Sequence, residues 1–174
     1  MKFVLSIPDE EAALSEYRDA EDLKEFVARA GCEGIETIRC LEPSSPKLKG
    51  VKVLGVHMWF YFSWVDFFRG DTAGVEKDFG SMETAFDFYG GEDFSCIMRQ
   101  YEEDLEYAHG LGAEYVVFHV ADVPIGEIYR YEHFHSSMDV IEASFRIINS
   151  LFRGKEDRYN FHLLLENLWW PGLN

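Results

Sequence analysis

The stretch of the chain that decides the fold is residues 161–172, which read FHLLLENLWWPG. Its continuous apolar run, residues 161–165, is typical of a strand buried on both faces of a parallel sheet. The run ends directly in a carboxylate, Glu166, and an amide, Asn167. Because parallel α/β folds carry their chemistry at the carboxyl ends of strands, this position makes Glu166 a candidate site residue.

Upstream of this stretch, short β patterns alternate with amphipathic helical patterns. The expected strands are residues 3–7, 34–38, 51–56, 115–120 and 161–165. Helical patterns cover residues 21–30 and 96–110, and a third helix carries apolar residues at alternating spacings of three and four, at positions 138, 141, 145, 148 and 152. The alternation predicts βαβ units, a parallel sheet and right-handed crossovers. No linker interrupts it, so we expect residues 1–174 to belong to a single domain.

The first helical pattern, residues 21–30, has an apolar face and suitable capping residues at both of its ends. Leu23, Phe26, Val27 and Ala30 recur at the spacing of one helix face. Asp19 and Asp22 are alternative N-caps, and Gly31 stands where a helix usually ends.

The connection from His57 to about Phe94 is too long and too aromatic for a plain helix. Two interpretations of this segment stay open. Long connections in compact domains are usually functional or act as lids, whereas aromatic side chains of this density also serve simply to cover a sheet.

Composition limits the class of protein. Of 174 residues, 47% are hydrophobic and 16% aromatic, which indicates a folded globule. The longest apolar runs are far too short for a membrane span, and the N-terminus lacks a secretory signal pattern.

The three cysteines form no CxxC pair, which favours free thiols in a reducing cytosol. We therefore expect a cytoplasmic protein without a membrane partner.

The charge of the chain argues against nucleic-acid binding. The formal net charge is −16, and an acidic chain repels a phosphate backbone unless a basic patch offsets that repulsion. Only a thin cluster, Lys47, Lys49 and Lys52, is present. No nucleic-acid partner is expected, while a homo-oligomer is left open.

Polar side chains end three of the expected strands: His57, His119 and Glu166. All three should face one concave surface at the carboxyl ends of the sheet. A carboxylate after three leucines is costly to bury unless it is paired, protonated or bound to metal. Imidazole with carboxylate suits Mn, Zn, Co or Fe, and carboxylates with water suit Mg. The alternative for each histidine is a hydrogen-bonded structural role.

Glu36, inside the second strand, offers another carboxylate near this surface. Its alternative role is that of an interior or rim residue with a structural partner. No nucleotide-binding or nucleophile motif competes, because GxGxxG, GxxxxGK[ST], GxSxG and HExxH are all absent.

Four segments together resemble a known family. They are Gly34-Ile35-Glu36, Gly55-Val56-His57, residues 108–119 and Leu165-Glu166-Asn167. In this order they resemble the xylose isomerase-like TIM barrels, a superfamily that includes sugar-phosphate isomerases and epimerases and the endonuclease IV group. The resemblance extends over essentially the whole chain and implies a parallel (β/α) barrel of the TIM type.

The resemblance also implies site roles. Glu166 matches a glutamate that is a metal ligand and, in many epimerases, an acid/base. His57 and His119 match histidines that act as ligands in the endonuclease group or as substrate contacts in the sugar enzymes. On this resemblance, Trp59 and Phe60 are expected to stack on a sugar face. Glu36, from its position in the second strand, is expected to contact substrate. The implied cofactor is a divalent metal, Mn, Mg, Co or Zn.

The family barrel has eight βα units, whereas this chain shows about five, and the remaining metal ligands of the family come from later strands. Since each unit needs roughly 30 residues or more, we expect the chain to be the N-terminal part of a longer protein, an incomplete barrel. Taken alone, it should bind metal poorly and be inactive.

Three functions follow from these observations. The first is a metal-assisted isomerase or epimerase of a sugar or sugar phosphate, which abstracts a proton next to a carbonyl. The alternatives are an endonuclease IV-like DNA repair enzyme, which the net charge opposes, and a non-catalytic protein that binds a small ligand on the same fold.

Overall fold

The computed structural model describes residues 2–40, 43–124, 134–155 and 157–167. Its strands are β1 (Val4–Pro8), β2 (Gly34–Ile38), β3 (Val53–His57), β4 (Tyr115–His119) and β5 (His162–Glu166). Its helices are α1 (Ala20–Arg29), α2 (Trp64–Arg69), α3 (Thr72–Phe79), α4 (Met82–Tyr89), α5 (Ser95–Leu111) and α7 (Ser137–Phe152), together with a short 3-10 turn, η1 (Pro46–Leu48).

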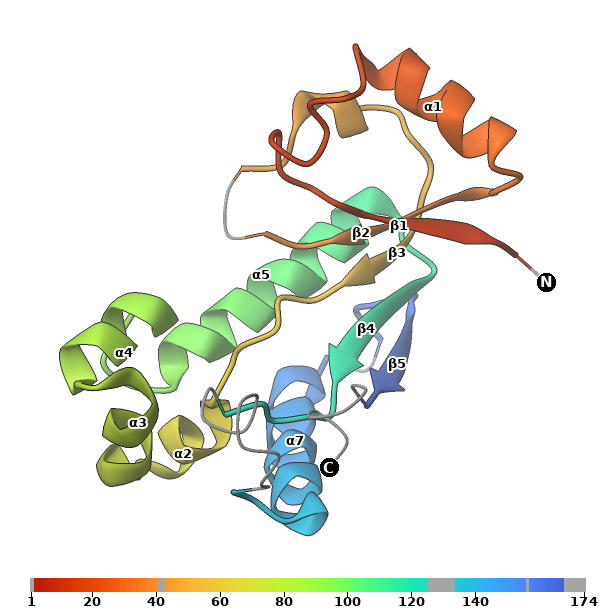
Figure 1. Cartoon of the computed structure of the whole chain (residues 1–174). Helices are drawn as coiled ribbons and strands as arrows, with labels where there is room; N and C mark the ends of the chain where they lie inside the picture. Colours follow the sequence, from red (N-terminus) through yellow and green to blue (C-terminus); the bar gives the residue numbers. More distant parts are fainter. Residues whose placement is uncertain (1, 41–42, 125–133, 156, 168–174) are drawn as a thin grey trace. The chain divides into compact units, whose positions relative to one another are not determined.

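The strands form one open parallel sheet in the order β1-β2-β3-β4-β5 (Figure 1). The register pairs Leu5 with Ile35 and Val56 with Val116. This arrangement confirms the predicted α/β class and parallel sheet. Each predicted strand lies within two residues of its observed bounds, and the differences fall at strand ends, where hydrogen bonding rather than side-chain pattern sets the boundary.

By contacts, the chain divides into two compact units. Unit 1 comprises Met1–Trp59, Asp104–Phe118 and Tyr159–Leu164, and unit 2 comprises Phe60–Glu103, His119–Arg158 and Leu165–Asn174. Each unit is described by itself below.

In unit 1, α1 begins as its cap chemistry predicts. Asp19 is the N-cap and accepts hydrogen bonds from the backbone N–H groups of Glu21 and Asp22. Leu23 and Val27 are buried, but Phe26, predicted on the same face, lies more than a third exposed at the margin of that face.

A buried ion cluster holds the ends of the first strands of unit 1. The guanidinium of Arg39 donates to Asp9 and, from Nε, to Oδ1 of Asp104 at 3.2 Å. Both carboxylates are fully buried. The backbone N–H of Cys40 donates to Asp9 at 2.8 Å, and that of Trp59 donates to Asp104 at 2.9 Å. The loops after β1, β2 and β3 are thus tied to α5 through two carboxylates and one cation.

The middle of the sheet in unit 1 contains a close approach at Gly55. Strand register places Gly55 between Glu36 on β2 and Tyr115 on β4. A Cβ at position 55 would lie 2.2 Å from Cζ of Tyr115, so the tyrosine ring occupies that space. The ring lies across the glycine, and its hydroxyl donates to Glu36 at 2.8 Å. Burial and this hydrogen bond raise the pKa of Tyr115 strongly.

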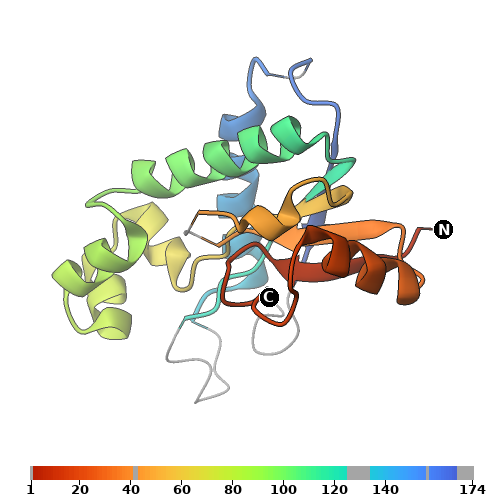
Figure 2. The same cartoon turned by 90° about the horizontal axis from the view of Figure 1, so that it is seen from above.

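Unit 2 is built on aromatic side chains. The connection after β3 forms three short helices, α2, α3 and α4, which contact one another (Figure 2). Phe67 of α2 stacks on Tyr89 of α4, with ring centroids 4.2 Å apart. The buried Tyr89 hydroxyl donates to the carbonyl oxygen of Ser63 at 2.8 Å. The structure therefore favours a packing role for these aromatics, as the core of this unit.

A second ion cluster lies in unit 2. Nδ1 of His135 is 2.8 Å from Asp122, and Nε2 of the same ring is 2.8 Å from Asp66. Asp122 is fully buried and also accepts from the backbone N–H of Trp64 at 3.1 Å. The hydrogen bonds to Asp122 and Asp66 raise the pKa of His135 to about 10, although burial opposes the rise. At neutral pH an imidazolium therefore links α2, the segment after β4 and the start of α7.

One burial prediction is wrong. The strand predicted over residues 161–165 was expected to be buried on both faces, but Leu164 and Leu165 of β5 are exposed. The reason is that β5 is an edge strand of the described sheet. In α7, the apolar set at spacings of three and four is largely exposed, and the buried side is a different set: Val140, Ala143, Ser144, Ile147 and Leu151.

Within the part of the chain that the structure describes, no helix combines the length and the apolarity that crossing a bilayer requires.

Replacing Gly55 with Ala is expected to destabilise the protein by about 1–3 kcal/mol, because the new methyl group overlaps the Tyr115 ring. Urea unfolding measures the change. Gly110→Ala in α5 is the matched control, since a Cβ there meets nothing within 4 Å and alanine favours a helix. Adding Tyr115→Leu to Gly55→Ala should recover part of the loss. Equal stability of wild type and Gly55→Ala would contradict the close approach.

The His135 cluster predicts a dependence of stability on pH. The pKa of His135 is about 10 in the folded protein, above its value of about 6.5 when unfolded. The stabilisation is therefore fully present below about pH 6.5 and is lost as pH rises through 10. We expect a loss on the order of a few kcal/mol between pH 6 and pH 10 in wild type.

The variant His135→Gln should lack most of this loss, and the difference between the two unfolding curves isolates the histidine from other titrating groups. NMR of the imidazole nitrogens tests the same point directly. A neutral His135 ring at pH 7.5 would contradict the ionic assignment.

Candidate metal centre

The carboxyl ends of β4 and β5 bring two predicted residues together. His119 is the last residue of β4, and Glu166 is the last residue of β5. The backbone N–H of Val120 donates to the carbonyl oxygen of Glu166 at 2.8 Å, which joins the two strand ends. Nε2 of His119 lies 3.7 Å from Oε2 of Glu166. This proximity matches the expectation that the two side chains lie together at the strand ends, and their sharing of a functional site stays a prediction.

The two side chains differ in their access to solvent. The His119 side chain is 10% exposed and that of Glu166 is 51% exposed. The pair therefore consists of an enclosed nitrogen donor and an accessible carboxylate, which a bound ion or a substrate can reach from solvent.

An aromatic ring supports the imidazole. Phe60 follows β3 closely in the chain, and its ring meets that of His119 with centroids 4.8 Å apart and planes inclined by 71°. Phe62 packs on Phe60 in a similar edge arrangement, at 5.4 Å. Such contacts restrict the orientation of the imidazole. The sequence places Phe60 among many aromatics, and nothing in that pattern singles it out as the neighbour of His119.

His57 belongs to unit 1, where it is the last residue of β3. Its Nδ1 is 3.2 Å from the carbonyl oxygen of Met58. A carbonyl only accepts, so Nδ1 is the donor in this contact. Metal-binding histidines commonly have this arrangement, in which one nitrogen donates to a carbonyl and the other faces the ion.

Trp59 also lies in unit 1 and is half-buried. Its backbone N–H donates to the buried Asp104, so the Arg39 cluster fixes the chain just after β3. Sequence reasoning missed this link, because Asp104 lies on α5, far along the chain. Stacking of the indole on a sugar stays a prediction.

Glu36 has structural partners on both carboxylate oxygens. Ser6 donates to Oε1 at 2.9 Å and Tyr115 donates to Oε2 at 2.8 Å. This matches the structural alternative for Glu36, and a contact of Glu36 with a substrate stays a prediction.

One sequence signal could have revealed the contact between Tyr115 and Glu36. A glycine inside a β pattern, here Gly55, commonly marks the close approach of another group.

Chemically, the pair at the ends of β4 and β5 can bind a cation or transfer a proton. Imidazole nitrogen and carboxylate oxygen are both ligands of divalent transition metals. A half-exposed carboxylate beside an enclosed imidazole can also accept a proton from a bound molecule.

Comparisons with protein-family models, with curated proteins and with solved structures give no match for this chain.

Proposed function

We propose that the protein is a metal-dependent isomerase or epimerase of a sugar or sugar phosphate, built on a barrel of the TIM type. The single observation that carries the proposal is the pair His119 and Glu166 at the ends of adjacent parallel strands, 3.7 Å apart. The open five-stranded parallel sheet is compatible with such a barrel. The family resemblance of the sequence supports the assignment of the reaction.

The donor set fits a divalent metal ion. Within unit 2, His119 and Glu166 each offer one ligand atom. We propose this pair as ligands, with water or substrate oxygens completing the coordination, while a metal or substrate contact of His57 stays a prediction. An imidazole together with a carboxylate favours Mn, Co or Zn over Mg. Catalytic metal sites typically leave a position open for water or substrate.

The residues have separable roles in the proposed reaction. A bound divalent ion would polarise the oxygens of the substrate. Glu166, whose carboxylate reaches solvent, accepts the proton from the carbon next to the carbonyl. His119 is enclosed and keeps its orientation through Phe60. Phe60 and Phe62 provide an apolar wall near this imidazole, and such a wall favours the less polar face of a sugar.

A nucleic-acid substrate is disfavoured. The chain carries 32 acidic and 16 basic residues, and binding to a phosphate backbone gains most of its affinity from Lys and Arg. A small sugar or sugar phosphate needs only a local site, which the overall charge does not forbid.

The proposal predicts weak but measurable binding of Co²⁺ and Mn²⁺ by the purified chain, since a pair of protein ligands holds a divalent ion less tightly than a full set. Titration calorimetry and Co²⁺ absorption spectra measure it directly, without any assay of activity. Glu166→Gln and His119→Ala should each weaken binding by about tenfold or more, because each removes one of few ligands. Glu83→Gln in α4 and His109→Asn at the end of α5 are the matched controls for the two residue types and should leave binding unchanged.

Absence of metal binding by wild type, or equal binding by Glu166→Gln and wild type, would contradict the proposed site. The reaction is tested separately by NMR, as metal-dependent exchange of a carbon-bound proton with deuterium in a panel of ketoses and sugar phosphates. Exchange on a member of the panel would support the proposed reaction, whereas metal binding without exchange would support the metal site alone.

A further inference from the structure

The aromatic cluster of unit 2 continues outward from its core to the surface. Trp64 and Tyr89 are each only 2% exposed. Phe68 of α2, Phe86 of α4 and Phe94, which directly precedes α5, are half-buried. The rings of Phe68 and Phe94 meet edge to face with centroids 4.9 Å apart, and Phe94 also lies beside Trp64, at 6.3 Å. The outer rings of one packed cluster therefore present part of their apolar surface to solvent.

These outer rings line a cavity of about 370 Å³ between α2, α3, α4 and the segment before α5, and Val75 and Met82 complete its apolar wall. Exposed residues of two turns, 70–72 and 92–93, form the mouth of the cavity. The first turn joins α2 to α3 and the second lies between α4 and α5 (Figure 1). Gly70 and Gly90 cap the ends of α2 and α4 in the left-handed conformation, which lets the chain turn sharply there. A cavity of this size with apolar walls suits a small organic molecule.

The mouth of this cavity is acidic. Asp71, Glu92 and Asp93 bring three carboxylates to it, and Arg69 brings one guanidinium. That guanidinium already pairs with Asp139 of α7 at 2.5 Å. The charge that a ligand would meet at the mouth is therefore negative.

Two of the three carboxylates are fixed by hydrogen bonds. Asp71 is the N-cap of α3 and accepts from two backbone N–H groups of that helix, each at 3.2 Å. The backbone N–H of Ser95 donates to Asp93 at 2.8 Å. Hydrogen bonds from the side chain and the backbone of Ser95 lower the pKa of Asp93, so this carboxylate is ionised at neutral pH. Glu92 adjoins Asp93 and is exposed, so its carboxylate can turn toward a bound group.

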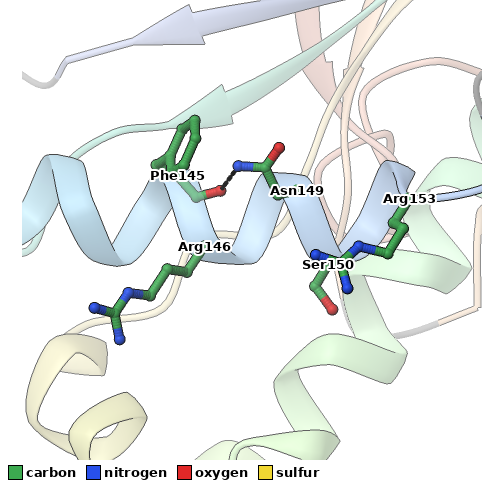
Figure 3. A pocket seen from close by; sticks show the side chains of 5 residues that line it. All are labelled: Phe145, Arg146, Asn149, Ser150 and Arg153. Atoms are coloured by element: carbon green, nitrogen blue, oxygen red, sulfur yellow. Dashed lines mark hydrogen bonds between the residues drawn. The ribbon is translucent and has the colours of Figure 1, made fainter.

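Another hollow of unit 2 differs in charge. It measures about 570 Å³ and lies along the second half of α7, where the described residues that line it are Phe145, Arg146, Asn149, Ser150 and Arg153 (Figure 3). The charged groups of this lining are both guanidiniums. The acidic mouth of the α2–α4 cavity is thus a property of its own residues and does not simply follow from the net charge of −16.

An organic cation matches both features of the α2–α4 cavity. Its apolar body gains by leaving water for the phenyl rings, and its charge is attracted by ring faces and by carboxylates. An inorganic cation would leave the apolar wall unused, and an organic anion would meet the carboxylates. We propose that this cavity binds a small organic ammonium ion, whose apolar body lies against Phe68, Phe86 and Phe94 and whose ammonium group meets Glu92. This proposal does not depend on the proposed enzymatic function.

Three probes with the same apolar body and different head groups test the proposal: phenylbutylamine, phenylbutanol and phenylbutyrate. Titration of the whole chain, followed by NMR of the backbone amides, gives a dissociation constant for each. The amine should bind with a dissociation constant of about 0.1–1 mM. The alcohol should bind about tenfold more weakly, because it lacks the charge, and phenylbutyrate more weakly still. The amide shifts caused by the amine should centre on residues 70–72 and 92–94.

Reversing one charge at the mouth tests the role of Glu92. Glu92→Lys should weaken binding of the amine by about tenfold or more and strengthen binding of phenylbutyrate, while the alcohol binds as to wild type. Glu103→Lys is the matched control, because Glu103 is an exposed residue of α5 in the same unit and does not line the cavity. Both variants change the net charge equally, so an effect of overall charge would appear in both.

Replacing one ring tests the aromatic wall. Phe86→Leu keeps an apolar side chain but removes the ring face, so it should weaken binding of the amine more than binding of the alcohol. Circular dichroism checks that each variant is folded.

Failure of phenylbutylamine to bind wild type, or equal affinities for the amine and the alcohol, would overturn the cation site. Amide shifts confined to α7, or unchanged binding of the amine to Glu92→Lys, would overturn the assignment of the site to this cavity.

Discussion

Burial of two carboxylates around Arg39 is the constraint on which much of unit 1 depends. A buried charge without a partner costs several kcal/mol, so Asp9 and Asp104 require the guanidinium between them. The same carboxylates accept backbone N–H groups of the loops after β2 and β3. One cation therefore fixes where three strands of the sheet end. His57 ends β3 and Trp59 follows it directly, so the placement of these two candidate residues rests on this cluster.

Unit 2 uses a similar solution with a different cation. His135 lies between Asp66 and Asp122 as Arg39 lies between Asp9 and Asp104. The chain has 32 acidic residues and 16 basic ones, so buried carboxylates have few cations to share. In each cluster a single cation pairs with two buried carboxylates, so fewer cations are needed. It also satisfies two acceptors while only one cation is desolvated.

The sequence predicted the parts of the fold that periodicity controls. Strands and helices with a clear repeat were found within two residues, and the ends of β4 and β5 correctly marked His119 and Glu166 as neighbours. Contacts between distant segments were not predictable in this way. Asp104 and Asp122 look like any other acidic residue in the sequence, because their burial depends on partners 65 and 13 positions away.

The exposure of β5 and of the apolar residues Met138, Ile141 and Phe145 of α7 illustrates the same limit. Both segments have apolar patterns that predict burial, and the patterns do not say which neighbour provides it. In α7 two apolar sets compete for the core of unit 2, and the set with the smaller side chains, including Ala143 and Ser144, is the one that packs there. Small residues allow the helix to approach closely, whereas the larger Met138 and Phe145 stay outside.

The close approach at Gly55 links two positions that lie 60 residues apart in the chain. Because the Tyr115 ring occupies the space of a Cβ at position 55, a larger residue there is acceptable only when position 115 becomes smaller. Glu36 would then lose the hydroxyl that binds its carboxylate. In related sequences, substitutions at positions 36, 55 and 115 should therefore be correlated, so that the three positions covary.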